Sequence, residues 1–147
     1  MKPPAPFKVV DTLKIARKYF AFTSNRLNDL GIYLGLGEKI PTHGLDLWKR
    51  CEKGDKKAWE EMVKYNKRDV VLLKDVYLRL LPYMRRHPNL SVLKGDISCP
   101  RCGSIHLHHR GIAVTAARKY RRFQCQNCGG WGRDAKSEAQ PSTTRQI

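Results

Sequence analysis

The sequence predicts an α/β chain, in which a helical N-terminal region is followed by a small β module held together by a metal ion. Apolar residues recur at helical spacing between residues 11 and 80. Two Cys-x-x-Cys pairs lie near the C-terminus, and Ser104–His108, after the first pair, alternate as in a half-buried β-strand. The expected organisation is a helical domain over 1–86, a linker over 87–95, a β module over 96–133 and a disordered tail over 134–147.

A short strand and a helix are expected at the start of the chain. Residues 7–10 read Phe-Lys-Val-Val, which is a β-prone run. Asp11 is placed to cap a helix through Phe20, because a carboxylate at the N-cap accepts hydrogen bonds from the N–H groups of the first turn. Leu13, Ala16 and Phe20 would then share one face of this helix.

Further helices are expected before residue 86. Either Ser24 or Asn25 is a suitable N-cap for a second helix, which carries leucines at helical spacing. A third, short helix is expected to begin at Leu45. Asp55 is placed to cap a long helical region that extends to Leu80.

The two cysteine pairs are typical of a zinc site. They are Cys99-Pro-Arg-Cys102 and Cys125-Gln-Asn-Cys128, and 22 residues lie between them, which suits one β-hairpin. Glycine follows each pair and allows a tight backbone turn. Four thiolates fill the tetrahedral coordination of Zn²⁺ and leave no open position, so this zinc would be structural. Disulfides and free thiols are the alternatives.

The chain of 147 residues is strongly basic, with 29 Lys or Arg residues, 13 Asp or Glu residues and a formal net charge of +16. Such a surface usually binds the phosphate backbone of DNA or RNA, and the alternative is a surface that is merely solvated. No apolar run approaches the roughly 20 residues that span a bilayer, so no membrane partner is expected. The N-terminus lacks the apolar core of a secretory signal, which makes the cytoplasm the expected location.

Cations and aromatic residues are interleaved before the second cysteine pair. This pattern suits a nucleic-acid contact, in which cations bind phosphates and rings stack on bases. The candidate nucleic-acid-binding residues are Arg118, Lys119, Tyr120, Arg121, Arg122 and, beyond the second pair, Trp131. In the alternative interpretation Tyr120 and Phe123 form a small core beneath solvated cations, and Trp131 suits a core position as well as a stacking position.

Tyr65 and Asp69 lie four residues apart in the long helical region, so the phenol and the carboxylate share one helix face. A carboxylate in such a pair can hold Mg²⁺ or Mn²⁺ beside a scissile phosphate, while the phenol orients an attacking water. The alternative is structural: Tyr65 packs against its neighbours, and Asp69 pairs with a lysine or an arginine.

Three segments of the chain carry a resemblance to a known family: Val9–Arg17, Asn25–Gly35 and Tyr65–Val70. Together they resemble the C-terminal half of a 3′→5′ exonuclease of the DEDDy group. This group belongs to the ribonuclease H-like superfamily and is related to the proofreading domains of family B DNA polymerases. Phage-encoded members, which carry a zinc ribbon after the nuclease domain, look especially similar. The resemblance implies a partial ribonuclease H-like domain, mainly its helical C-terminal half, followed by a β zinc ribbon.

The same resemblance assigns roles to single residues. Tyr65 and Asp69 match the third motif of the family, so Tyr65 would orient water and Asp69 would ligate Mg²⁺ or Mn²⁺. The first motif, Asp-x-Glu, does not occur in the sequence, and the aspartate of the second motif also lacks a counterpart. Asp11 matches the aspartate that opens a helix after the second motif, so it is expected to be a helix cap.

The missing acids limit what the chain is expected to do alone. One carboxylate does not hold two divalent ions, so an isolated enzyme is not expected. The chain would be the nucleic-acid-binding C-terminal portion of a 3′→5′ exonuclease, and a separate chain is the candidate partner that supplies the other half. The alternative is a non-catalytic DNA- or RNA-binding accessory module with a structural zinc ribbon. The resemblance places it in a bacterial or phage-infected cell.

Overall fold

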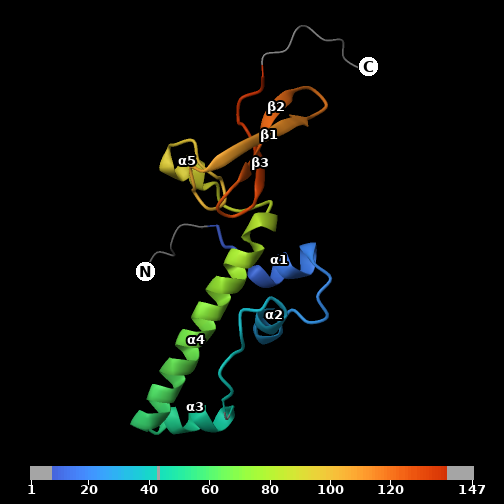
Figure 1. The fold of residues 1–147 in the computed structure, drawn as a ribbon. Coiled ribbons are helices and arrows are strands. Elements are labelled where there is room, and N and C mark those ends of the chain that lie inside the picture. The colour runs from blue at the N-terminus through green and yellow to red at the C-terminus, as the bar shows by residue number, and fades with distance from the viewer. Residues whose placement is uncertain (1–7, 43, 139–147) are drawn as a thin grey trace. The chain divides into compact units, whose positions relative to one another are not determined.

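Residues 8–42 and 44–138 are described by the computed structural model, and they divide into two units (Figure 1). The first unit covers residues 11–80 and consists of helices. The second covers residues 81–138 with the segment 8–10 and contains a three-stranded antiparallel sheet. The chain is therefore a mixed α/β protein, as the sequence predicts at this coarse level.

The helical unit is built on one long helix. Three shorter helices pack on it, and Figure 1 shows α3 beside the start of α4 and α1 nearer its end. The helices are α1 (Thr12–Tyr19), α2 (Leu27–Tyr33), α3 (Leu45–Glu52) and α4 (Lys56–Leu80). Within the described ranges, no helix combines the length and the apolar character that crossing a membrane requires.

Two of the predicted helix caps are confirmed. The Asp11 carboxylate accepts a hydrogen bond from the backbone N–H of Lys14 at 3.1 Å. The carboxylate of Asp55 accepts from the backbone N–H groups of Lys57 at 2.9 Å and Ala58 at 3.3 Å. Both carboxylates thereby bind donors that have no partner within their helix.

The predicted cap of the second helix is wrong. The N-cap of α2 is Arg26, whose side chain makes no capping hydrogen bond, rather than Ser24 or Asn25. The Ser24 hydroxyl instead donates to the carboxylate of Asp29, which lies in the first turn of α2. The Ser24 hydroxyl also accepts from the backbone N–H of the N-cap residue Arg26 at 3.4 Å, so it contacts the start of α2 without capping the N–H groups of its first turn.

The strand predicted at residues 7–10 is not formed at its described residues, 8–10. Lys8, Val9 and Val10 have no regular structure, and Phe7 lies outside the described residues. A strand needs a neighbour to receive its backbone hydrogen bonds, and the described residues between 8 and 80 include no other strand. The local β propensity of this run is therefore not sufficient.

Helix α4 has one buried face and one partly exposed apolar face. Leu72 and Val76 are fully buried, and Leu72 contacts the α2 backbone at Gly31. On the other side Trp59, Val63 and Val70 keep 53%, 46% and 62% of their surface exposed. These positions are four and seven residues apart, so they follow one face of the helix. Contiguous exposed apolar surface of this kind is typical of a face that packs against another element or partner.

The second unit places a small sheet after two short helical turns. The turns are η1 (Leu81–Tyr83) and α5 (Leu90–Lys94), and the strands are β1 (Leu107–Val114), β2 (Lys119–Cys125) and β3 (Trp131–Arg133). The strands are antiparallel in the order β1-β2-β3. The register of β1 on β2 shifts between His109 and Ile112. The alternation predicts a strand from Ser104, but β1 begins three residues later, at Leu107.

Helix α5 lies within the segment expected to be a linker. Asn89 caps it by accepting from the backbone N–H of Ser91 at 3.1 Å. The backbone N–H of Leu90 donates to the carbonyl of Pro100 at 2.9 Å, and Lys94 Nζ donates to the carbonyl of Gly103 at 2.9 Å. These bonds attach α5 to the loop that carries the first cysteine pair.

The start of the predicted tail is attached to the sheet. The backbone N–H of Asp134 donates to the carbonyl of Arg121 at 2.9 Å, and that of Glu138 donates to the carbonyl of Lys119 at 3.0 Å. Residues 134–138 thus continue along β2 past the end of β3, because β2 is longer than its partner strand. Residues 139–147, where the tail was also expected, lie outside the described part of the chain.

Candidate metal centre and nucleic-acid interface

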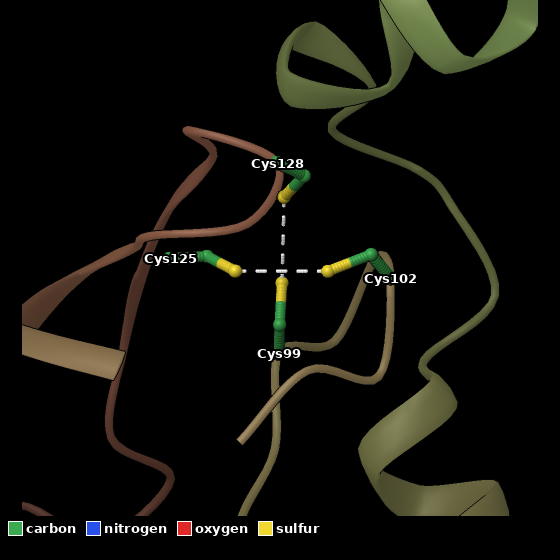
Figure 2. A group of neighbouring side chains, drawn as sticks. All are labelled: Cys99, Cys102, Cys125 and Cys128. Atoms are coloured by element: carbon green, nitrogen blue, oxygen red, sulfur yellow. Dashed lines mark hydrogen bonds between the residues drawn. The ribbon is translucent and has the colours of Figure 1, made fainter. Parts of the chain in front are cut away.

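The four paired cysteines converge on one point from two loops, as Figure 2 shows. Their sulfur atoms all lie within 4.8 Å of one another. The sulfur of Cys99 is 3.7 Å from that of Cys128, and the sulfur of Cys102 is 3.6 Å from that of Cys125. Each short distance thus joins one cysteine of the first pair to one of the second.

These distances fit a metal and do not fit disulfides. Four sulfurs at about 2.3 Å from a tetrahedral Zn²⁺ would be about 3.8 Å apart, close to the two distances observed. A disulfide would bring two sulfurs to about 2.05 Å, and all four cysteines are free. The four cysteines therefore form a cluster able to hold a metal ion such as zinc.

The two loops have the same local geometry. The N–H of Gly103 donates to the carbonyl of Cys99 at 2.8 Å, and the N–H of Gly129 donates to that of Cys125 at 2.9 Å. Both glycines have a left-handed backbone, with φ of +70° and +72°, which other residues adopt only with strain. The glycine after each pair, noted in the sequence, is therefore what closes each loop.

The environments of the four thiols differ. Burial raises the pKa of Cys99 and that of Cys128. Burial also acts to raise the pKa of Cys102, but hydrogen bonds from the Ser104 backbone and the Asn127 side chain outweigh it and lower this pKa to about 7. A bound cation would favour the thiolate form at every position, since metals bind thiolates rather than thiols.

The strand register assigns the basic and aromatic residues of the sheet to two faces. Arg122 lies opposite Arg133 and Gln124 lies opposite Trp131, so these four side chains share one face. Tyr120 joins them, because it is two residues from Arg122 on the same strand. The set of Tyr120, Arg122, Trp131 and Arg133 is called the aromatic face below.

Two arginines of the aromatic face stack on its two rings. The guanidinium carbon of Arg122 is 4.5 Å from the centre of the Trp131 ring. The guanidinium carbon of Arg133 is 3.9 Å from the centre of the Tyr120 ring. Trp131 nevertheless keeps 41% of its surface exposed, so of its two predicted positions it takes the surface one. Both contacts are cation–π interactions between neighbouring strands.

The opposite face of the sheet is packed and partly neutralised. Phe123 is buried there, and its ring contacts Gly132 and His109. Arg121 Nε lies 3.1 Å from a carboxylate oxygen of Asp134, whose other oxygen is 3.4 Å from His109 Nε2. Arg121 and Arg122 are adjacent in the sequence, yet they have different neighbours and different charge environments.

The predicted nucleic-acid residues are therefore divided by the structure. Tyr120, Arg122 and Trp131 lie on the aromatic face, whereas Lys119 and Arg121 belong to the other face. Arg118 is exposed in the turn before β2. Arg133 was not predicted from the sequence, although its position two residues after Trp131 in an alternating strand places both on one face.

Tyr65 and Asp69 meet at a third residue, Lys39. The ammonium of Lys39 lies 2.7 Å from a carboxylate oxygen of Asp69 and donates a hydrogen bond to the phenol oxygen of Tyr65 at 2.9 Å. Both hydrogen bonds raise the pKa of Lys39, and the bond to Asp69 has the larger effect. Asp69 and Tyr65 thus share one helix face, as predicted, and in this arrangement Asp69 pairs with a lysine.

In the described part of the chain, Asp69 does not belong to a cluster of three or more potential metal ligands. Within residues 8–42 and 44–138, the four cysteines are the sole cluster of three or more potential metal ligands. One oxygen of Asp69, Oδ1, is buried and has no hydrogen-bond partner. Tyr65 also packs on a core cluster that includes Cys51 and Met62. The pair is therefore built into the helical unit through the packing of Tyr65 and the ion pair of Asp69.

A pocket of the helical unit lies elsewhere. It has a volume of about 510 Å³ and is lined by residues of α1, α2 and the segment before α2, together with Leu73 of α4. Neither Tyr65 nor Asp69 lines it. The predicted catalytic pair is therefore not the floor of this pocket.

Comparison with known proteins gives no assignment for these sites. No protein-family model, curated protein or solved structure matches the chain. The features that bear on function are therefore the cysteine cluster, the two faces of the sheet and the Lys39–Asp69 pair.

Proposed function

We propose that this chain binds DNA or RNA through its zinc-binding unit, as the C-terminal portion of a divalent-metal-dependent 3′→5′ exonuclease. The observation that carries the binding proposal is the aromatic face of that unit, where two arginines lie against two aromatic rings. Residues 96–138 contain eight Lys or Arg residues and three acidic residues. Of these acids, in the described part of the chain, Asp134 is the one that pairs with a cation of the unit. Most of its cations therefore remain available for phosphates.

Zinc has a structural role in this proposal. The four cysteines lie in two loops, one before the start of β1 and one at the end of β2. A metal bound to them would hold these loops together and so fix the sheet that presents the cations. A site closed by four thiolates offers no position for a reacting water. Any chemistry would therefore occur elsewhere in the chain.

The exonuclease part of the proposal depends on Tyr65 and Asp69. Both side chains reach the same point, the ammonium of Lys39, and one oxygen of Asp69 is buried without a partner. In a complete enzyme Asp69 would ligate Mg²⁺ or Mn²⁺, and Tyr65 would orient the attacking water. The cation now beside Asp69 would then be a metal ion instead of Lys39. A further chain or segment would supply the remaining acids.

A second candidate function is a non-catalytic accessory that binds nucleic acid. The ion pair between Lys39 and Asp69 favours it, because a carboxylate that is already neutralised at 2.7 Å is a poor metal ligand. Both candidates share the binding proposal and differ in chemistry alone. They are separated by an assay of degradation.

The test is degradation of a 5′-labelled single-stranded oligonucleotide by the chain with Mg²⁺ or Mn²⁺, next to the variants Asp69→Asn and Asp75→Asn. Asp75 is the matched control, since it lies on the same helix and its change removes the same charge. For the chain alone we expect salt-sensitive binding without a ladder of shortened products.

Two other outcomes would be decisive. A ladder that disappears in Asp69→Asn and persists in Asp75→Asn would establish catalysis by this chain. Absence of binding at low salt, in a protein that retains its zinc, would overturn the proposed function.

A further inference from the structure

The aromatic face has a composition that the rest of the sheet lacks. On it, two rings alternate with two arginines across two neighbouring strands. The acid of the adjoining segment, Asp134, binds Arg121 and His109 on the opposite face. The aromatic face is thus positively charged, and its cations have no described carboxylate as a partner.

The stacking leaves each arginine able to bind a phosphate. A guanidinium that lies flat on a ring uses its face for that contact, and its N–H groups point outward along its edge. Arg122 Nε donates to the carbonyl of Arg110 at 3.3 Å, which also fixes its orientation. Planar N–H groups held in this way suit the two oxygens of a phosphate.

The two rings are too far apart to serve one base. Trp131 lies opposite Gln124, and Tyr120 is four residues from Gln124 along β2. At about 3.3 Å per residue the two rings are separated by about 13 Å along the sheet. Each ring would therefore stack on a different base, and Arg122 and Arg133 lie between the two rings along the sheet.

From this arrangement we infer that the aromatic face binds single-stranded nucleic acid, with bases stacked on Trp131 and Tyr120 and phosphates held by Arg122 and Arg133. The inference rests on the proposed nucleic-acid binding and names its substrate class. A duplex cannot use the rings, because its bases are already stacked inside the helix, whereas a single strand exposes them. A face made for duplex phosphates would need the cations alone.

The first measurement is affinity for a 15-nucleotide single strand and for a duplex of the same length, by fluorescence anisotropy with the full chain. We expect tighter binding of the single strand. Trp131→Leu should weaken binding of the single strand about 5- to 150-fold, the range for loss of one stacked base, and leave binding of the duplex unchanged. Trp131→Phe, which keeps a ring, should restore most of the affinity.

Arg121 is the matched control for the charge of Arg122. Arg122→Ala and Arg121→Ala remove the same charge from adjacent positions of β2, but Arg121 lies on the opposite face and is paired with Asp134. We expect a clear loss in Arg122→Ala and a smaller one in Arg121→Ala. Zinc content, measured for every variant, shows that the unit remains folded.

A second readout reports on the ring itself. With 5-fluorotryptophan the chain has three ¹⁹F signals, from Trp48, Trp59 and Trp131. A single strand should shift the signal of Trp131 and leave the other two in place.

The failures of the two proposals can be told apart. Equal affinity for duplex and single strand, or an unshifted Trp131 signal, would overturn the stacking inference while nucleic-acid binding stands. No binding of either form at low salt would overturn the proposed function itself.

Discussion

Gly31 shows how tightly the helical unit is packed at a single residue. It lies in α2, and a Cβ at this position would overlap the carbonyl oxygen of Gly37 and approach Leu72. The carbonyl belongs to the backbone, so it cannot swing aside as the end of a long side chain can. The position therefore accepts glycine alone without a shift of the chain.

Gly31→Ala should destabilise the helical unit by about 1–3 kcal/mol, the usual cost of an added methyl group in a packed site. Urea unfolding followed by circular dichroism at 222 nm measures the change, because α1–α4 supply most of the helical signal. Ile32→Ala is the control, since Ile32 is 54% exposed and should have little effect. Equal stability of the two variants would contradict the packing described.

At this scale, the sequence predicts contacts that are local. Asp11 and Asp55 cap their helices as expected, because a cap depends on the next three residues. Lys39 was not identified, because the partner of Asp69 lies 30 positions earlier and no local pattern links them. The predicted role of Ser24 is wrong because α2 begins after Arg26, so the Ser24 hydroxyl bonds to the Asp29 carboxylate and the Arg26 backbone N–H and not to the N–H groups of the first turn.

The unit that contains the cysteine cluster is the one whose stability is expected to depend on a bound metal ion. All four cysteines of the cluster lie within residues 99–128, and the helical unit over 11–80 supplies none of them. Helix α5 is bonded to the first loop through Leu90 and Lys94. Removal of the metal should therefore affect the sheet and α5 and spare α1–α4.

Chelation of zinc is expected to abolish the dispersed NMR signals of residues 99–133 and to leave most of the helical signal at 222 nm. A control variant, Cys51→Ser, changes a cysteine of the helical unit and should leave zinc content at one ion per chain. Loss of all helical signal on chelation would show that the helices depend on the metal as well.

The accuracy of the element predictions depended on length and neighbours. The 25-residue α4 was expected, because a long periodic pattern predicts a helix well. Helix α5 has five residues, too few for a period, and only its Asn89 cap indicated it. The strand expected at 7–10 lacks a partner, and the start of β1 was placed three residues early because alternation does not define where pairing begins.

Charge is a property of the whole molecule, and both units contribute to it. Residues 11–80 contain 15 Lys or Arg residues against 10 acids, and residues 96–138 contain eight against three. Net charge therefore does not say which unit binds. The proposal that the sheet binds depends instead on the arrangement of its cations, since the aromatic face combines them with rings.

Two double variants with the same total charge test this point. Arg122→Ala with Arg133→Ala should weaken binding of a single strand and make the slope of log K against log salt shallower by about 1.4, or about 0.7 per phosphate contact. Lys56→Gln with Lys57→Gln removes two charges from the helical unit and should leave the slope nearly unchanged. Similar effects of the two pairs would mean that the charge acts as a diffuse field.

At the level of the molecule, the sequence predicted the cysteine cluster and not the faces of the sheet. Spacing and residue type were enough for the cluster, because the chemistry of zinc fixes both. Which of two adjacent arginines faces the rings depends on the register between β2 and β3, which no local signal specifies. The fold class was predictable only at the coarse level of a mixed α/β chain, because local patterns indicate helices and strands but not how the strands pair.

The stacked arginines have a thermodynamic consequence. Side chains as long as arginine lose conformational freedom when they bind, and each such loss reduces affinity by about 0.5–1.5 kcal/mol. Arg122 and Arg133 have already lost part of this freedom, because each lies against a ring before any ligand arrives. A lysine at either place would carry the same charge without the flat contact, so it would have to be ordered on binding. The aromatic rings therefore contribute to phosphate binding even where no base touches them.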